Sequence, residues 1–127
     1  AKTPPDFGQQ NETAAPGIVL VEQADPGFDL PETEDVDERQ SPDADGYTNF
    51  LNKLIEETKA FPGQVLFVHG DVHFLKLDKP LIKQSDLVEN FTRLETFGSP
   101  NVHWVRVTVD PNAREVFTIH PMIVKGN

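Results

Sequence analysis

Residues 64–81 read Gln-Val-Leu-Phe-Val-His-Gly-Asp-Val-His-Phe-Leu-Lys-Leu-Asp-Lys-Pro-Leu. The stretch begins as a short apolar run, which is typical of a buried β-strand. It passes directly into two histidines and an aspartate placed around Gly70. In α/β sheets a rigid strand fixes the backbone, and the loop at its carboxyl end carries the reacting groups. We therefore expect strand 64–69 in the core, followed by a functional loop in which Gly70 makes the turn that other residues cannot make.

The segments before residue 64 predict the rest of a crossover unit. Residues 17–23 contain four consecutive large aliphatic side chains and run into a turn at Pro26-Gly27, which indicates a strand. Residues 47–60 repeat apolar side chains at helical spacing, which predicts an amphipathic helix. The order strand–helix–strand favours two parallel strands whose carboxyl ends lie at the same edge. Asp25, which follows the first strand, should then lie near the loop 69–73.

The second half of the chain is predicted to be mainly β. Segments 74–78, 91–97 and 102–109 alternate between apolar and polar residues, and 116–124 is a fourth candidate strand. Short turn-forming links favour an antiparallel meander. The expected fold class is therefore α/β, with one crossover helix and a mainly antiparallel second half.

Length and charge restrict the functions that the chain can have. A chain of 127 residues fits one domain, and it has no apolar run of the roughly 20 residues that a membrane helix needs. Residues 1–46 contain 12 of the 21 acidic residues and two basic ones, whereas residues 47–127 contain nine of each. Nucleic acid and anionic membranes would be repelled, so neither is an expected partner. Residues 1–16 are expected to be a flexible segment, and residues 29–46 a solvated acidic loop without the ligand spacing of an EF-hand.

Two further sequence features concern covalent chemistry. The chain has no cysteine, which excludes disulfides, thiolate metal ligands and a cysteine nucleophile. Asn-x-Thr triplets at Asn11 and Asn90 are candidate acceptors for glycans. His69 precedes the glycine of the central loop, and we expect it to form a hydrogen bond within that loop.

Four segments of the second half, together with Asp25 and its neighbours, carry a family resemblance. The segments are residues 68–74, 78–81, 90–98 and 102–111. They resemble a divergent microbial branch of the calcineurin-like metallophosphoesterases, and the resemblance covers residues 17–124. It implies that residues 17–127 form a half-domain equivalent to the C-terminal half of the family's α/β sandwich.

The resemblance also implies a metal site. In the family, the two histidines of a Gly-His-x-His motif bind metal ions. Here Gly70 and His73 match that motif, and Asp71 stands where its first histidine would be. A further metal-binding histidine usually ends the preceding strand, and Gln23 or Asp25 occupies that place. The implied ligands of a Mn, Zn, Fe or Mg ion are thus His73, Asp71 and Asp25, the alternative for His73 being a surface histidine outside the ligand set.

Two other motifs of the family, Gly-Asp-x-x-Asp and Gly-Asn-His, do not occur in these 127 residues, and Asp-x-His occurs only as Asp71-Val72-His73, inside the segment already compared with Gly-His-x-His. The resemblance therefore implies part of a metal-dependent phosphoesterase that hydrolyses a phosphate mono- or diester. Such a part would be inactive alone and would need an N-terminal half of the same protein as its partner. No catalytic residue is assigned. The alternative is a non-catalytic binding or structural module that retains the fold.

Overall fold

The computed structural model describes residues 15–27, 47–82 and 86–126. It contains β1 (Gly17–Val21), α1 (Thr48–Ala60), β2 (Gln64–His69), β3 (Lys76–Asp78), β4 (Phe91–Glu95), β5 (Trp104–Val109) and β6 (Phe117–Met122). A mixed α/β architecture is therefore confirmed. The expectations for a flexible segment 1–16 and an acidic loop 29–46 fall almost wholly outside the described residues and stay predictions. In the described part of the chain, no helix is long and apolar enough to cross a membrane.

The larger of the two sheets has the strand order β1-β2-β4-β3. Strands β1 and β2 are parallel, as the crossover through α1 predicts. Both strand pairs within the second half, β3 with β4 and β5 with β6, are antiparallel as expected, but they do not form a simple meander, because β4 also pairs parallel with β2. The long connection 79–90 returns the chain from β3 and inserts β4 between β2 and β3. A tight-turn rule cannot predict such an insertion.

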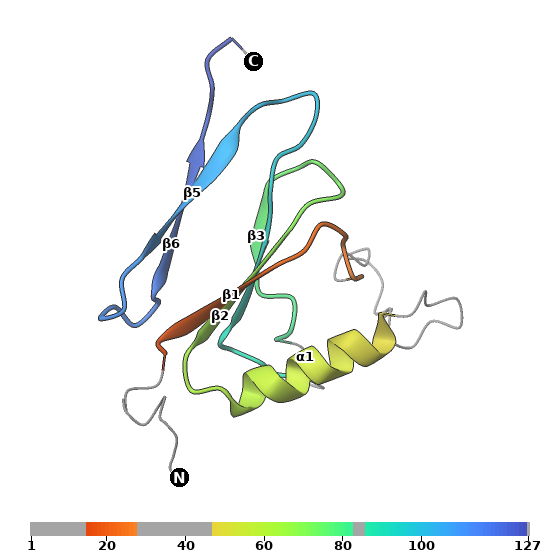
Figure 1. Cartoon of the computed structure of the whole chain (residues 1–127), viewed down its shortest axis with the longest axis vertical. Coiled ribbons are helices and arrows are strands. Elements are labelled where there is room, and N and C mark those ends of the chain that lie inside the picture. The colour runs from red at the N-terminus through yellow and green to blue at the C-terminus, as the bar shows by residue number, and fades with distance from the viewer. Residues whose placement is uncertain (1–14, 28–46, 83–85, 127) are drawn as a thin grey trace.

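The larger sheet has one face turned toward α1, and this face holds the core. Helix α1 supplies Leu51, Leu54 and Ile55, which are all buried. Partner residues in β2 and β4, such as Val65 and Phe91, lie opposite each other in register and share this face. The full buried cluster consists of Leu51, Leu54, Ile55, Val65, Phe67, Leu81, Val88 and Phe91. Figure 1 shows α1 on one side of the sheet and the β5–β6 hairpin on the other.

The hairpin of β5 and β6 is antiparallel and forms a separate two-stranded sheet. Its packing against the larger sheet is shown by Gly17, where an added Cβ would lie 2.7 Å from the Phe117 ring. Phe117 and Ile119 also line one cavity together with Leu66 and Leu77. The hairpin therefore lies over part of the face of the larger sheet that is opposite α1 (Figure 1).

Asn90 joins the end of α1 to the start of β2. Its Nδ2 donates to the carbonyl oxygens of Thr58, Phe61 and Gly63, at 3.0, 3.1 and 2.8 Å. These bonds satisfy carbonyls that a helix leaves without partners at its C-terminal end. A glycan on Nδ2 would replace one of its two hydrogens, so glycosylation at Asn90 would disrupt this set of bonds. The other candidate, Asn11, lies outside the described residues.

Candidate metal centre

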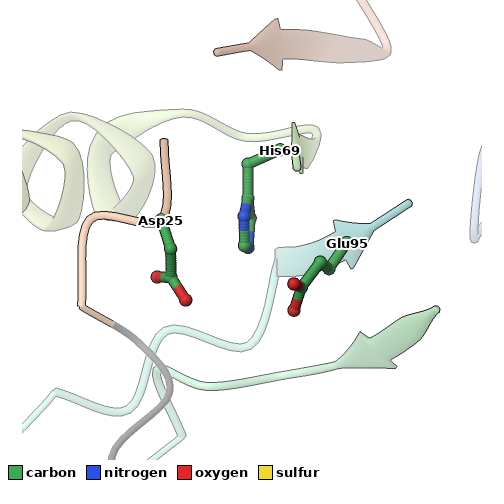
Figure 2. Close-up of side chains that lie close together, drawn as sticks. All are labelled: Asp25, His69 and Glu95. Atoms are coloured by element: carbon green, nitrogen blue, oxygen red, sulfur yellow. The ribbon is translucent and has the colours of Figure 1, made fainter. Parts of the chain in front are cut away.

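The carboxyl ends of three parallel strands meet at one edge of the larger sheet. His69 is the last residue of β2, Glu95 is the last residue of β4, and Asp25 lies in the loop that follows β1. His69 and Glu95 are direct partners in the parallel register. Each of the three residues offers one ligand atom, and these atoms all lie within 4.8 Å of one another. Figure 2 shows the imidazole between the two carboxylates.

The three side chains are held inside the protein. His69 is 1% exposed and Glu95 is 0% exposed, while Asp25 is half-buried. Glu95 Oε2 accepts a hydrogen bond from the Val72 N–H at 3.1 Å, and Glu95 Oε1 is buried as well. Asp25 Oδ1 accepts from the Gly27 N–H at 2.9 Å. Backbone donors thus orient both carboxylates before any ligand binds.

The two ring nitrogens of His69 have different partners, and these partners determine the tautomer. Nδ1 lies 2.8 Å from the carbonyl oxygen of Gly70, as expected for a bond within the loop. A carbonyl only accepts, so Nδ1 carries the hydrogen. Nε2 lies 3.3 Å from Nη1 of Arg93, and a guanidinium only donates. The imidazole is therefore neutral with its lone pair on Nε2, which is the form that binds metal ions.

Arg93 is held by Asp78 on the neighbouring strand. Its Nε and Nη2 donate to the two carboxylate oxygens of Asp78 at 2.7 and 2.8 Å. The Arg93 side chain is 2% exposed and that of Asp78 is 40% exposed. Because the guanidinium is planar, this two-pronged contact also fixes the direction of Nη1, which points at His69.

The side chains of this edge suit a divalent cation. Two carboxylates, those of Asp25 and Glu95, lie beside the His69 imidazole. Buried carboxylates are costly unless they are paired, hydrogen-bonded or bound to a metal ion. Two carboxylates and one imidazole are a donor set that suits transition-metal ions.

The spacing of the ligand atoms is close to what one ion requires. Bonds of about 2.0–2.2 Å to nitrogen and oxygen place neighbouring ligands roughly 3–4 Å apart. Atoms within 4.8 Å of one another must therefore close in slightly on an ion. Asp25 is the member with room for this movement, because it lies in a loop and is only half-buried. The group could thus hold a metal ion.

Of the three ligands that the sequence suggested, the structure brings Asp25 into this group. Asp71 and His73 lie outside it. Asp71 Oδ2 instead accepts from the Asp25 N–H at 3.2 Å. His73 is exposed, its Nδ1 lies 2.9 Å from the Ser99 carbonyl oxygen, and its ring packs so closely on Gly98 that a Cβ there would lie 2.7 Å away. Both residues anchor the loop that borders the group.

The turn in this loop does not depend on Gly70. Positive φ angles of 90° and 79° occur at Asp71 and His73, and Gly70 has no such angle. The expectation that Gly70 makes the turn is therefore wrong. Its N–H donates to the Gln23 carbonyl at 3.0 Å, which continues the contact between the first two strands. The chain reverses only after this bond, so the left-handed conformations fall on the following residues.

Sequence reasoning missed Glu95 and Arg93. Both lie inside the segment 91–97 that was predicted as a strand, whereas β4 ends at Glu95. With the shorter strand and its parallel pairing to β2, Glu95 follows the same pattern as Asp25, a polar residue at the carboxyl edge. Arg93 had no signal of its own, since an alternating strand is expected to present its charged residues to water.

A scan against models of known families, a search of curated proteins and a search of solved structures found no match to this chain.

Proposed function

We propose that this chain carries a metal-binding part of a divalent-metal-dependent phosphoesterase, with Asp25, His69 and Glu95 as ligands of one ion. The observation that carries the proposal is the convergence of these three side chains at the carboxyl edge of parallel strands. This edge is where open α/β sheets bind their ligands. The neutral His69 tautomer and the oriented carboxylates provide the protonation states that metal ligation needs.

The reaction class is supported by the resemblance of residues 68–74 and 90–98 to calcineurin-like metallophosphoesterases. A bound divalent ion would acidify a water molecule and polarise a phosphoryl oxygen. The three donors leave further coordination positions for water, for a phosphate oxygen or for ligands from an N-terminal half of the same protein. We therefore expect this chain to bind one ion and to be inactive toward phosphate esters when it is alone.

A second candidate function is a non-catalytic binding or structural module of the same fold. The observation that favours it is the contact between Arg93 Nη1 and His69 Nε2 at 3.3 Å. In this interpretation the guanidinium serves as a permanent internal cation at the polar edge. Such a module would bind no divalent ion at the group formed by Asp25, His69 and Glu95.

Calorimetric titration of Zn²⁺ and Mn²⁺ into the protein separates the two candidates. We expect one bound ion per chain. Glu95→Gln should lower the affinity at least tenfold, because a neutral amide oxygen, which is a weaker ligand, replaces a buried carboxylate. Glu89→Gln is the matched control, since Glu89 is exposed and outside the group. His73→Ala should also retain binding. If His73→Ala abolished binding and Glu95→Gln left it unchanged, the assignment would be contradicted and the ligand role would return to His73.

A chromogenic phosphodiester tests the reaction class. The purified chain with Zn²⁺ or Mn²⁺ should give no turnover above the metal-ion blank, because three donors do not build a two-metal site. Addition of a polypeptide that carries the missing motifs should produce turnover that Glu95→Gln abolishes. Turnover by the isolated chain that depends on Glu95 would show that no second segment is needed.

A further inference from the structure

A buried cation contacts the candidate metal ligand from within the protein. Arg93 is 1% exposed as a residue, and its Nη1 donates a hydrogen bond to the lone pair of His69 Nε2. The other nitrogen, Nδ1, is committed to the Gly70 carbonyl. A metal ion can therefore reach His69 only through Nε2, at the position that the guanidinium contacts.

The guanidinium cannot turn away from His69 by itself. Asp78 holds Nε and Nη2 at the same time, and the guanidinium group that joins them to Nη1 is planar. Moving Nη1 away from Nε2 requires breaking the contact with Asp78 or shifting both side chains together. Close packing around Arg93, one of the largest fully buried side chains, opposes such a shift.

We propose that Arg93, fixed by Asp78, determines which metal ions the site accepts. This inference rests on the proposed function of the Asp25–His69–Glu95 group. An ion that uses His69 must displace a donated hydrogen bond and lie close to a positive charge. Zn²⁺, which has high affinity for imidazole, carries this cost in full, whereas Mg²⁺ and Ca²⁺, which prefer oxygen, can bind the two carboxylates without Nε2. Arg93 is thus a specificity-determining residue that lowers affinity for all ions that use Nε2 and keeps His69 in the ligand tautomer.

The test uses the double substitution Arg93→Met/Asp78→Asn. It removes the cation and its carboxylate together, so the net charge of the chain is unchanged and neither member of the Arg93–Asp78 pair remains as a lone charge. Circular dichroism and thermal melting verify the fold. Arg106→Met, on exposed β5 residue Arg106, is the matched control. The affinities for Zn²⁺ and Mg²⁺ are measured by calorimetry in the wild type and in both variants.

We expect the double substitution to tighten Zn²⁺ binding at least about tenfold and Mg²⁺ binding less than about threefold, because only Zn²⁺ gains access to an imidazole nitrogen. Arg106→Met should match the wild type. A merely structural role of Arg93 would lower both affinities alike or leave both unchanged. It would not change the ratio of the two affinities.

Nitrogen-15 spectra of the His69 ring give an independent measurement without metal. In the wild type, Nδ1 should appear as the protonated nitrogen and Nε2 as a hydrogen-bonded lone-pair nitrogen. In Arg93→Met/Asp78→Asn, the Nε2 resonance should move toward that of a bare lone-pair nitrogen. An unmoved Nε2 resonance would show that Arg93 does not donate to it and would overturn the inference.

The calorimetric outcomes distinguish this inference from the proposed function. Tighter Zn²⁺ binding in the double variant supports both, including the case in which the wild type binds too weakly to measure. Equal Zn²⁺ affinity in the wild type and the double variant overturns the role of Arg93 and leaves the metal site in place. Absence of binding in both proteins overturns both proposals.

Discussion

The helix-facing side of β2 and β4 changes character along its length. At the amino end the two strands present Val65, Phe67 and Phe91, which pack on α1. Toward the carboxyl end, the same face of the two strands presents His69, Arg93 and Glu95, which are all buried. The first region stabilises the fold by burying apolar area, whereas the second costs free energy and persists only through its hydrogen bonds and ion pair. Two neighbouring regions of one face thus contribute to the free energy of folding with opposite signs.

The two regions are in direct contact. The Phe67 ring lies 6.0 Å from Phe91 on its apolar side and 5.8 Å from the His69 ring on its polar side, measured between centroids. The apolar region therefore forms one wall of the polar one and excludes water from it. In such surroundings electrostatic interactions between the polar groups are stronger than in water. Substitutions on either side of this boundary test how the two regions depend on each other.

The largest effect is expected from Phe67→Ala, which removes the wall between the regions. A buried Phe→Ala change leaves a cavity and costs about 3–5 kcal/mol of unfolding free energy. Urea denaturation of both proteins measures this difference. Phe74→Ala is the matched control, because Phe74 is 70% exposed, and it should change stability little. Equal losses in the two variants would contradict the assignment of Phe67 to the core.

A smaller loss is expected from Asp78→Ala, which breaks the ion pair of the polar region. Removing one partner of a buried pair costs about 3–5 kcal/mol, and we expect about 2–3 kcal/mol because Asp78 itself is 40% exposed. Glu89→Ala, at an exposed glutamate, is the control for loss of a carboxylate. If urea denaturation shows no difference between the two variants, the polar region is held by its backbone hydrogen bonds and not by this pair.

The smallest effect, with the opposite sign, is expected from Gly70→Ala at the edge of the polar region. Gly70 has no positive φ, and an added Cβ would lie 3.5 Å from the Gln23 carbonyl oxygen, an ordinary contact. Restricting the unfolded chain should therefore raise stability by about 0.4–1 kcal/mol. Gly98→Ala is the contrasting substitution, since its Cβ would lie 2.7 Å from the His73 ring. Destabilisation by Gly70→Ala would restore the turn role that the sequence suggested.

Local sequence patterns were sufficient for the strand–helix–strand unit. Residues 64–69 were predicted with the bounds that β2 has, and residues 47–60 with those of α1 to within one residue. Both depend on the periodicity of neighbouring side chains, which a local pattern contains. The parallel pairing of β1 and β2 followed from the helical crossover, and it placed Asp25 beside the loop 69–73 without any further information.

The composition of the candidate site depended on contacts that no local pattern contains. Whether β4 inserts parallel to β2 is decided by packing between distant segments, and that choice alone brings Glu95 to the carboxyl edge beside His69. The same insertion places Arg93 where it meets Asp78 and the His69 lone pair. By itself the sequence determined which strands form and that polar residues follow them, because secondary structure and turns are local. Only the tertiary structure decided which of those residues meet, because strand order and register are set by long-range burial of the shared face.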